Sequence, residues 1–345
     1  MKVGVLTAGG DCPGLNAVIR AVTRRCLSEG HDVVGLMRGY LGLADHNYVS
    51  LNMRTVSGIL PLGGTILSTS SFDPFREPAG VERVVAAMEH GGFDGIVAIG
   101  GEHTMGITRQ LYEQHHVPLV GVPKTIDNDV PCTDFTFGFD TAVQIATDAI
   151  DRLHTTAQSH DRVMVVEVMG RNTGWIAVFS GIAGGADAIV IPELELTVEE
   201  IGDAINARHH RGKSFSIVVV AEGASLAFSS GEKRQIRTSQ ESDEYGYPRL
   251  GGIGLALGQE IEARTGFETR VTTLGHVQRG GTPTAIDRVL ATRYGIKAAE
   301  LVMEGRFGEM AALRGQEMTS VPLSEVNGVK RVDLAYLRVA STFFG

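Results

Sequence analysis

Residues 118–129 read Pro-Leu-Val-Gly-Val-Pro-Lys-Thr-Ile-Asp-Asn-Asp, an apolar run followed at once by a lysine, a threonine and two aspartates. The apolar part, 118–122, predicts a buried strand, so Asp127 and Asp129 lie just beyond the carboxyl end of that strand. Ligands of open α/β sheets bind at this edge. In an extended segment the two carboxylates would point the same way, one to bind a metal ion and one to take a proton. Lys124 and Thr125 suit a phosphate-rich ligand, although a solvated turn that caps a helix would use the same residue types.

The composition predicts a cytoplasmic protein that binds neither nucleic acid nor membrane. A chain of 345 residues with 43% apolar and 21% charged residues is long enough for about two globular domains. The net charge of −9 argues against a general nucleic-acid-binding surface. The three cysteines lack metal-ligand spacing, which favours a reducing compartment. The first residues do not resemble a signal peptide, and charged residues interrupt the apolar stretch 163–192.

Short β-branched runs alternate with helical patterns along the chain. The predicted strands are nearly continuously apolar, as in parallel sheets buried on both faces, and cover residues 3–7, 32–37, 95–99, 118–122, 163–168, 188–191 and 216–221. This alternation predicts a doubly wound α/β fold with two similar blocks that divide near Gly138. The polar segment 224–250 breaks the rhythm and predicts an excursion from the sheet.

Two further glycine-bearing loops follow predicted strands. Residues 7–14 and 99–104 could each bring backbone N–H groups and a helix N-terminus to a phosphate, or could simply be tight packing turns. In the second loop Glu102 suits a metal ion, whereas His103 has no second histidine at ligand spacing.

Basic residues gather later in the chain. Arg171 follows the predicted strand 163–168, and Arg270, His276 and Arg279 lie in or near the run 275–281, Gly-His-Val-Gln-Arg-Gly-Gly. Each alone would be an ordinary surface residue, but together they could hold a sugar phosphate. Glycine-rich loops, aspartates and arginines without a nucleophilic triad favour phosphoryl transfer.

These motifs resemble, in the same order, those of the phosphofructokinase family. They are Gly-Gly-Asp-Cys-Pro-Gly-Leu-Asn at 9–16, Gly-Gly-acid-x-Thr at 100–104, Thr-Ile-Asp-Asn-Asp at 125–129, Met-Gly-Arg at 169–171 and the run 275–281. The resemblance spans about residues 1–330. It implies two Rossmann-like domains with mainly parallel sheets and the active site between them. It also implies a glycolytic role, Mg²⁺ as cofactor, and a homotetramer or homodimer whose active sites are shared between subunits.

The resemblance also implies domain bounds and a role for each matching residue. Residues 1–138 plus 278–328 would bind the phosphoryl donor, and 139–277 plus 329–345 would bind the sugar phosphate. Asp127 would be the general base, Thr125 and Arg171 would stabilise the moving phosphoryl group, and Glu102 and Asp129 would hold Mg²⁺. The donor phosphates would meet Gly10, Gly101, His103, Thr104 and Lys124. Fructose 6-phosphate would meet Thr125, Asp127, Met169, Gly170, Arg171, Glu222, His276 and Arg279, with Arg162 and Arg270 reaching its 6-phosphate from an adjacent subunit.

The prediction of the phosphoryl donor depends on a few positions at which the sequence departs from the family pattern. Lys124 resembles the actinobacterial pyrophosphate-using and mixed branch, because the bacterial ATP enzymes have glycine there. At the position of His103, family members that admit ATP have glycine and those that obstruct ATP have aspartate. A bulky imidazole at this position therefore favours pyrophosphate. Ser71 stands where the family usually has an arginine that contacts the donor.

Four hypotheses about the function therefore stay open. They are a pyrophosphate-dependent 6-phosphofructokinase, an ATP-dependent one, a kinase of another sugar phosphate such as sedoheptulose 7-phosphate, and a non-catalytic sugar-phosphate-binding subunit. NAD and lipid kinases share the Gly-Gly-acid-x-Thr pattern, but the run 275–281 counts against them.

Overall fold

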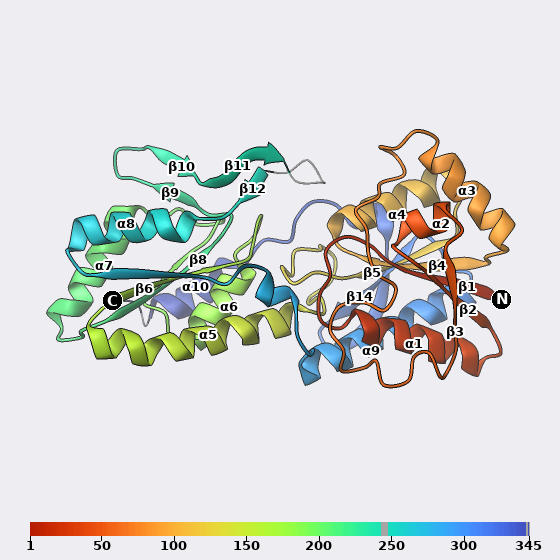
Figure 1. Ribbon diagram of the computed structural model, residues 1–345, viewed down its shortest axis with the longest axis horizontal. Coiled ribbons are helices and arrows are strands. Elements are labelled where there is room, and N and C mark those ends of the chain that lie inside the picture. The colour runs from red at the N-terminus through yellow and green to blue at the C-terminus, as the bar shows by residue number, and fades with distance from the viewer. Residues whose placement is uncertain (243–247, 343, 345) are drawn as a thin grey trace. The chain divides into compact units, whose positions relative to one another are not determined.

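The computed structural model describes residues 1–242, 248–342 and 344, which form two compact units (Figure 1). Unit 1 comprises Met1–Thr141 and Arg279–Val329, and unit 2 comprises Ala142–Gln278 and Lys330–Gly345. Each unit is a mixed α/β structure around its own sheet. No helix among the described residues has both the length and the apolar character needed to cross a membrane.

Unit 1 is built on a seven-stranded sheet with the order β15-β14-β5-β4-β1-β2-β3. The strands are β1 (Lys2–Thr7), β2 (Asp32–Leu36), β3 (Tyr48–Leu51), β4 (Gly95–Gly100), β5 (Leu119–Pro123), β14 (Glu309–Arg314) and β15 (Glu317–Pro322). The five central strands are parallel, and the edge strands β3 and β15 are antiparallel to their neighbours. In the centre, Val3 of β1 lies opposite Val33 of β2 and Gly95 of β4. The carboxyl ends of β1, β4 and β5 therefore meet at one edge.

Helices cover both faces of this sheet (Figure 1). One face carries α1 (Leu15–Ser28) and α9 (Ala285–Met303), and the other carries α2 (Tyr40–Ala44), α3 (Gly80–Gly91) and α4 (Glu102–His115). Gly295 lets α9 approach α1 closely, because a Cβ there would lie 2.7 Å from the carbonyl oxygen of Val18. The short η2 helix (Leu323–Glu325) follows β15. Burial of apolar side chains on both faces is what makes the central strands nearly uniformly hydrophobic.

Unit 2 has a four-stranded parallel sheet with the order β13-β6-β8-β7. Its strands are β6 (Val163–Val168), β7 (Ala188–Val190), β8 (Ser216–Ala221) and β13 (Thr269–Thr273). Every residue of β6 and β8 is buried. The helices are α5 (Phe139–His160), α6 (Trp175–Ala183), α7 (Val198–His210), α8 (Ile253–Thr265) and α10 (Leu334–Ser341), with η1 (Gly275–Arg279) after β13. Side chains of α7 and α8 share one apolar cluster with β6, β7 and β8.

The predicted fold class is confirmed, and all seven predicted strands are present within about one residue at each end. Four strands of the two large sheets escaped prediction: β3, β13, β14 and β15. Strand β13 reads Thr-Arg-Val-Thr-Thr and is only partly buried, whereas β14 contains two alanines and has no β-branched residue. β13 is rich in β-branched residues but has only one apolar residue, and β14 has apolar residues but no β-branched one, so neither combines the two features on which the prediction depended.

The polar segment 224–250 leaves the main sheet, as predicted, but it contains strands that its weak periodicity did not reveal. β9 (Ser225–Ala227) pairs antiparallel with β10 (Lys233–Gln235), and β11 (Arg237–Ser242) pairs with β12 (Pro248–Leu250). Residues 243–247 of this segment lie outside the described residues.

A buried carboxylate joins the starts of α9 and α5 within unit 1. The Asp287 side chain is fully buried and accepts hydrogen bonds from the Gly138 N–H at 2.9 Å, the Thr141 N–H at 2.8 Å and the Thr141 hydroxyl at 2.5 Å. These donors favour the charged form, but burial outweighs them and raises the pKa of Asp287 to about 6.

The raised pKa predicts a pH-dependent contribution of Asp287 to stability. The folded state holds this proton more tightly than the unfolded state, whose pKa is near 3.8. The stabilisation is therefore complete below about pH 4 and is lost as the pH rises to about 6. The loss amounts to about 3 kcal/mol. Denaturant titrations from pH 4 to pH 7 should show the free energy of unfolding of the wild type falling relative to that of Asp287→Asn. A difference that does not change with pH would contradict this assignment.

Candidate functional site

The first glycine-rich loop joins β1 to α1 in unit 1. Gly9 and Gly14 adopt positive φ angles of 75° and 107°, which glycine adopts without strain. Gly10 leaves no room for a side chain, because a Cβ there would lie 2.4 Å from Nη1 of Arg279. Residues 69 and 70 hold the loop from a second segment: the Thr69 hydroxyl donates to the Gly9 carbonyl at 2.6 Å, and the Gly9 N–H donates to the Ser70 carbonyl at 3.2 Å.

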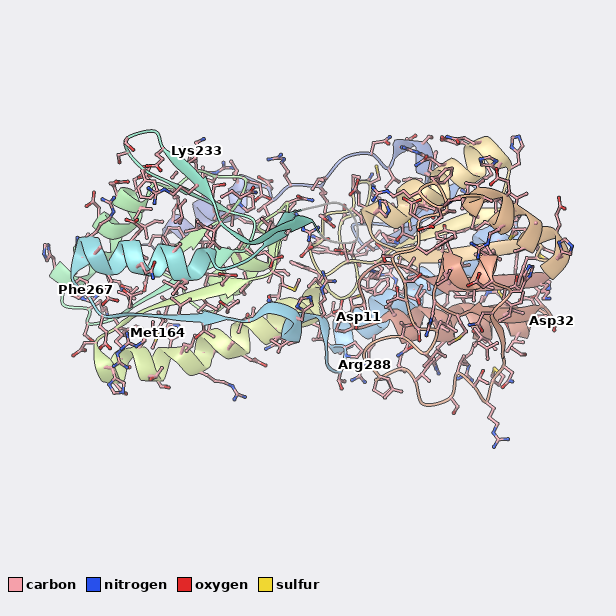
Figure 2. All side chains as sticks on the ribbon, turned by 45° about the horizontal axis from the view of Figure 1, so that its top comes forward. Asp11, Asp32, Met164, Lys233, Phe267 and Arg288 are labelled. Carbon is pink, nitrogen blue, oxygen red and sulfur yellow. The ribbon has the colours of Figure 1, made fainter. Side chains whose placement is uncertain are left out.

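The loops after β4 and β5 lie at the same edge of the sheet. The Lys124 N–H, after β5, donates to the carbonyl of Gly100 at 2.8 Å, and α4 begins immediately beyond at Glu102. The Ala8 N–H, after β1, donates to the carbonyl of Ile99 at 3.0 Å. In Figure 2, Asp11 after β1 and Asp32 at the start of the parallel strand β2 mark the two opposite edges. The sheet thus brings all three predicted loops together.

The Thr-Ile-Asp-Asn-Asp run is a bend, which corrects the expectation of an extended segment. Asn128 is fully buried, has a left-handed φ of 49°, and accepts the Thr136 N–H at 3.0 Å through its side-chain oxygen. The Thr125 hydroxyl accepts the N–H of Asp127 at 3.0 Å. Asn128 has no predicted role, yet its side chain anchors the run, and its position between two aspartates is the only sign of this in the sequence.

Positive charge is concentrated at the first loop. Lys124 is 4% exposed and donates a hydrogen bond from Nζ to the carbonyl of Gly10. Burial lowers the pKa of this ammonium group. Arg279 Nη1 lies 3.4 Å from the carbonyl oxygen of Asp11. Both cations therefore lie beside the backbone of the loop predicted to hold donor phosphates, and Arg279 belongs to unit 1.

Two carboxylates lie near one another at the same edge. Burial, and after it the charge of Asp129, raises the pKa of the Glu102 carboxyl. Among the described residues, no cluster of three or more His, Cys, Asp or Glu side chains is arranged to hold a metal ion. Magnesium needs no such cluster in phosphoryl-transfer sites, since it is bound there by one or two carboxylates, water and the substrate phosphates. The pair Glu102 and Asp129 fits that donor set.

His103 and Thr104 follow Glu102 in the first turn of α4. Thr104 is buried, and Nε2 of His103 lies 3.3 Å from an oxygen of Asp73. Asp73 was not singled out in the sequence, and it stands two residues beyond Ser71.

Unit 2 brings the predicted sugar-phosphate residues to the carboxyl ends of three neighbouring strands. Met169, Gly170 and Arg171 follow β6, Glu222 follows β8, and His276 lies in η1 after β13. The order β13-β6-β8 makes these three ends adjacent.

Two residues without a predicted role support this edge of unit 2. Gln278 is fully buried, accepts the Met169 N–H at 3.3 Å and donates to the Gly275 carbonyl at 3.0 Å. Gly223 allows the chain after β8 to touch the loop after β6, since a Cβ there would lie 1.8 Å from the carbonyl oxygen of Arg171. A glutamine in a Gly-His-x-Gln-Arg run gives no sign of burial, so only the structure identifies its supporting contacts.

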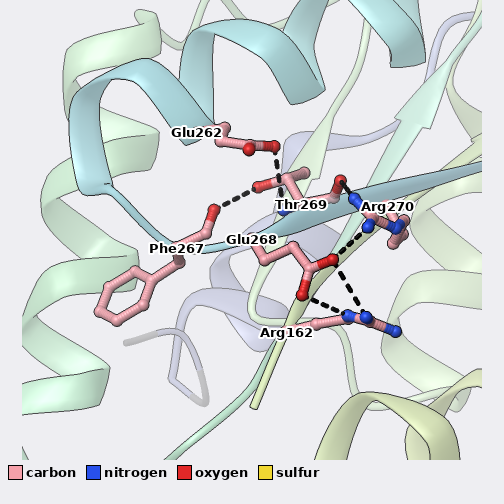
Figure 3. A network of polar contacts seen from close by, with 6 residues as sticks. All are labelled: Arg162, Glu262, Phe267, Glu268, Thr269 and Arg270. Atoms are coloured by element: carbon pink, nitrogen blue, oxygen red, sulfur yellow. Dashed lines mark hydrogen bonds and ion pairs between the residues drawn. The ribbon is translucent and has the colours of Figure 1, made fainter. Parts of the chain in front are cut away.

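Arg162 and Arg270 lie at the other edge of the same sheet (Figure 3). Arg162 precedes β6, and Arg270 pairs with Met164 near the start of that strand. Met164 and Phe267, labelled in Figure 2, mark this edge. The Glu268 carboxylate binds both guanidinium groups, accepting from Arg162 at 2.8 Å and 3.0 Å and from Nη2 of Arg270. The two arginines thus form a clamp that cannot share one small ligand with Met169 and Glu222 of the same sheet.

Comparison with known proteins identifies the family of this chain. The family model described as "Phosphofructokinase" matches residues 2–302. The chain belongs to the phosphofructokinase family of phosphotransferases. It is 51% identical, over the full length of both chains, to a pyrophosphate–fructose 6-phosphate 1-phosphotransferase of Streptomyces coelicolor.

Members of this family with different phosphoryl donors are almost equally similar to the chain. It is 50% identical, over 96% of each chain, to the ATP-dependent 6-phosphofructokinase 3 of the same organism. Among solved structures, that of phosphofructokinase from Saccharomyces cerevisiae superimposes with a TM-score of 0.78 at 32% identity over 94% of this chain. The chain spans 45% of the length of that larger yeast chain.

Proposed function

We propose that this phosphofructokinase transfers a phosphoryl group, with Mg²⁺, to the C1 hydroxyl of fructose 6-phosphate in glycolysis, and that it prefers pyrophosphate to ATP. The observation that carries the proposal is the convergence in unit 1 of three loops with two cations and two carboxylates at one sheet edge. Relatives named for fructose 6-phosphate phosphorylation, 50–51% identical, support the choice of acceptor.

The donor phosphates are assigned to the first loop and the start of α4. Gly10, Gly101 and Thr104 supply backbone and hydroxyl groups, and Lys124 supplies positive charge beside Gly10. A phosphate dianion placed there would relieve the cost of keeping a buried ammonium charged. His103 flanks this position and limits the length of donor that fits.

Magnesium is assigned to Glu102 and Asp129. When bound, the ion would neutralise charge on the donor phosphates. The two carboxylates bind the ion, and Asn128 fixes the backbone between Asp127 and Asp129 through its hydrogen bond to Thr136. Asp127 and Asp129, which belong to one bend, therefore have different roles in the proposal.

Asp127 is assigned as the general base that takes the proton of the sugar hydroxyl. It is half-buried, and its backbone N–H is held by the hydroxyl of Thr125. Thr125 and Arg171 are assigned to the moving phosphoryl group, whose charge they would stabilise.

The sugar phosphate is assigned to Met169, Gly170, Glu222, His276 and Arg279, with Arg162 and Arg270 contributed by an adjacent subunit. The position of the Arg162–Glu268–Arg270 clamp at the opposite sheet edge supports this sharing, since one copy of unit 2 does not bring both groups to one ligand. A homotetramer or homodimer would supply the second copy.

Two alternatives keep the same fold. ATP could be the better donor if the His103 ring rotates away from the phosphates. Ser71, in place of the usual arginine, and His103 together motivate the second alternative, a different acceptor such as sedoheptulose 7-phosphate. Initial rates with fructose 6-phosphate and sedoheptulose 7-phosphate, each with pyrophosphate and with ATP, decide among them, and a chain inactive with all four pairs would be a non-catalytic binding protein.

Asp127→Asn should lower kcat by roughly 10²–10⁴ with little change in KM, because the amide keeps the shape but cannot accept a proton. Steady-state kinetics at saturating Mg²⁺ measure this effect. An Asp127→Asn enzyme with nearly wild-type kcat would exclude Asp127 as the base.

Two inactive variants should restore each other if active sites are shared. Hybrids of Arg162→Ala and Asp127→Asn subunits contain sites with one intact copy of each residue, so activity should return after dissociation and reassembly. Hybrids of Asp127→Asn with His276→Ala are the matched control, because the proposal takes both residues from the same chain and expects no recovery. Recovery in neither hybrid, with mixing verified by mass, would argue for sites built from one chain.

The wild type should use pyrophosphate with a higher kcat/KM than ATP, and His103→Gly should shift the ratio toward ATP. Removing the imidazole opens the space that the α-phosphate of ATP requires, and every tenfold change in the ratio corresponds to about 1.4 kcal/mol. Parallel assays with both donors measure the ratio. A wild type that uses ATP well and ignores pyrophosphate would refute the donor assignment.

A further inference from the structure

The His103 side chain contacts a second segment of unit 1. Its ring belongs to the first turn of α4, and Nε2 lies 3.3 Å from Oδ2 of Asp73. The ring is about one-third exposed, whereas the Asp73 side chain is only one-tenth exposed. The contact therefore joins a ring that reaches solvent to a carboxylate that is held inside the unit.

Asp73 has an orientation fixed by its own turn. Its Oδ1 accepts the N–H of Phe75 at 2.9 Å, and its Oδ2 lies 3.3 Å from Nε of Arg76. The carbonyl of Asp73 also accepts the N–H of Arg76 at 3.0 Å. These contacts do not involve His103, so the carboxylate is a fixed point against which the ring can rest.

The turn that carries Asp73 is tied to the first phosphate loop. Thr69 and Ser70, a few residues earlier, hydrogen-bond both the carbonyl and the N–H of Gly9, and the Ser70 hydroxyl donates to the Arg38 carbonyl at 2.7 Å. Asp73 thus joins the start of α4 to a segment that also holds the first loop. A histidine in a first helical turn would otherwise choose among several staggered rotamers.

We propose that Asp73 is the positioning residue for donor selection: it holds the His103 ring in one orientation, so that the donor site admits pyrophosphate more readily than a nucleoside triphosphate. This inference rests on the proposed function, because it takes the loops of unit 1 as the donor site. Asp73 contacts neither substrate in the proposal and acts only through His103.

The position of Asp73 makes Ser71 part of the same arrangement. A segment that offers no arginine to the donor offers, two residues later, a carboxylate that fixes a neighbouring ring. The segment therefore contributes to donor selection by limiting space, and the positive charge for the donor comes from Lys124, which donates to the carbonyl of Gly10. Exclusion by a fixed group is effective only if rotating that group costs free energy. In this proposal the cost is the loss of the 3.3 Å contact between His103 and Asp73.

Asp73→Ser is the informative variant. A serine hydroxyl can still accept the Phe75 N–H and keep the turn, but it is too short to reach His103. Asp73→Asn is the matched control, since it keeps the length and a polar group facing the ring. Asp45→Ala, which removes an exposed partner of Arg83, controls for loss of a surface carboxylate in unit 1.

The measurement is the ratio of kcat/KM for ATP to that for pyrophosphate at saturating sugar phosphate. We expect Asp73→Ser to raise this ratio about tenfold, in the same direction as His103→Gly, and Asp73→Asn and Asp45→Ala to leave it within about threefold. In a His103→Gly background, Asp73→Ser should have no further effect, because its target is gone. An equal loss with both donors, or a full shift in the His103→Gly background, would overturn the proposal.

Binding measurements separate failure of this inference from failure of the proposed function. If the acceptor is not fructose 6-phosphate, the ratio of dissociation constants for Mg²⁺–ATP and Mg²⁺–pyrophosphate, from titration calorimetry, should still change on Asp73→Ser. A ratio that changes on His103→Gly but not on Asp73→Ser refutes the role of Asp73 and leaves the donor assignment intact. A ratio that changes with neither variant refutes both.

Discussion

The buried ammonium group of Lys124 and the backbone carbonyl of Gly10 form the contact on which the proposed donor site depends. An isolated charge in the interior is costly unless it is paired, and a single carbonyl compensates for it only in part. Burial accordingly lowers the pKa of Lys124. A site with this imbalance favours a ligand of high negative charge and small size, and inorganic phosphates have both properties. The parallel order of β1, β4 and β5 makes the contact possible, because it brings the ends of strands far apart in sequence to one edge.

Parts of the fold that rest on apolar strands could be predicted from the sequence, because burial on both faces requires β-branched and aliphatic residues in unbroken runs. The strands β13 and β14 could not, since neither combines apolar character with β-branched residues. The same division holds for the candidate site. Glycines and carboxylates after strands are visible as motifs, whereas Asn128, Gln278 and Asp73 act through side-chain contacts with residues 8, 109 and 30 positions away in the chain. The residue types alone do not reveal which groups these side chains contact.

The two edges of the unit 2 sheet have different electrostatic character. At the carboxyl ends of β6, β8 and β13, backbone close approach at Gly223 and the buried amide of Gln278 shape a compact loop cluster. At the amino ends, Glu268 holds two arginines side by side on the surface (Figure 3). Exposed ion pairs of this kind contribute little to stability, typically 0–1 kcal/mol each. Both guanidinium groups therefore face one anion, Glu268, and the proposed function uses the same two groups for the 6-phosphate of a ligand bound to an adjacent subunit.

A preference for one phosphoryl donor over another requires only a small difference in free energy. Two Streptomyces coelicolor relatives, 51% and 50% identical to the chain, are named for different donors, so overall identity does not report the donor. A hundredfold preference corresponds to about 2.7 kcal/mol. In the proposed function, the His103 side chain lies where the α-phosphate of ATP would be placed, and excluding that phosphate would supply a difference of this size. The informative positions are therefore those where this chain departs from the family pattern, Ser71 and His103, together with the contact that determines where the His103 ring can lie.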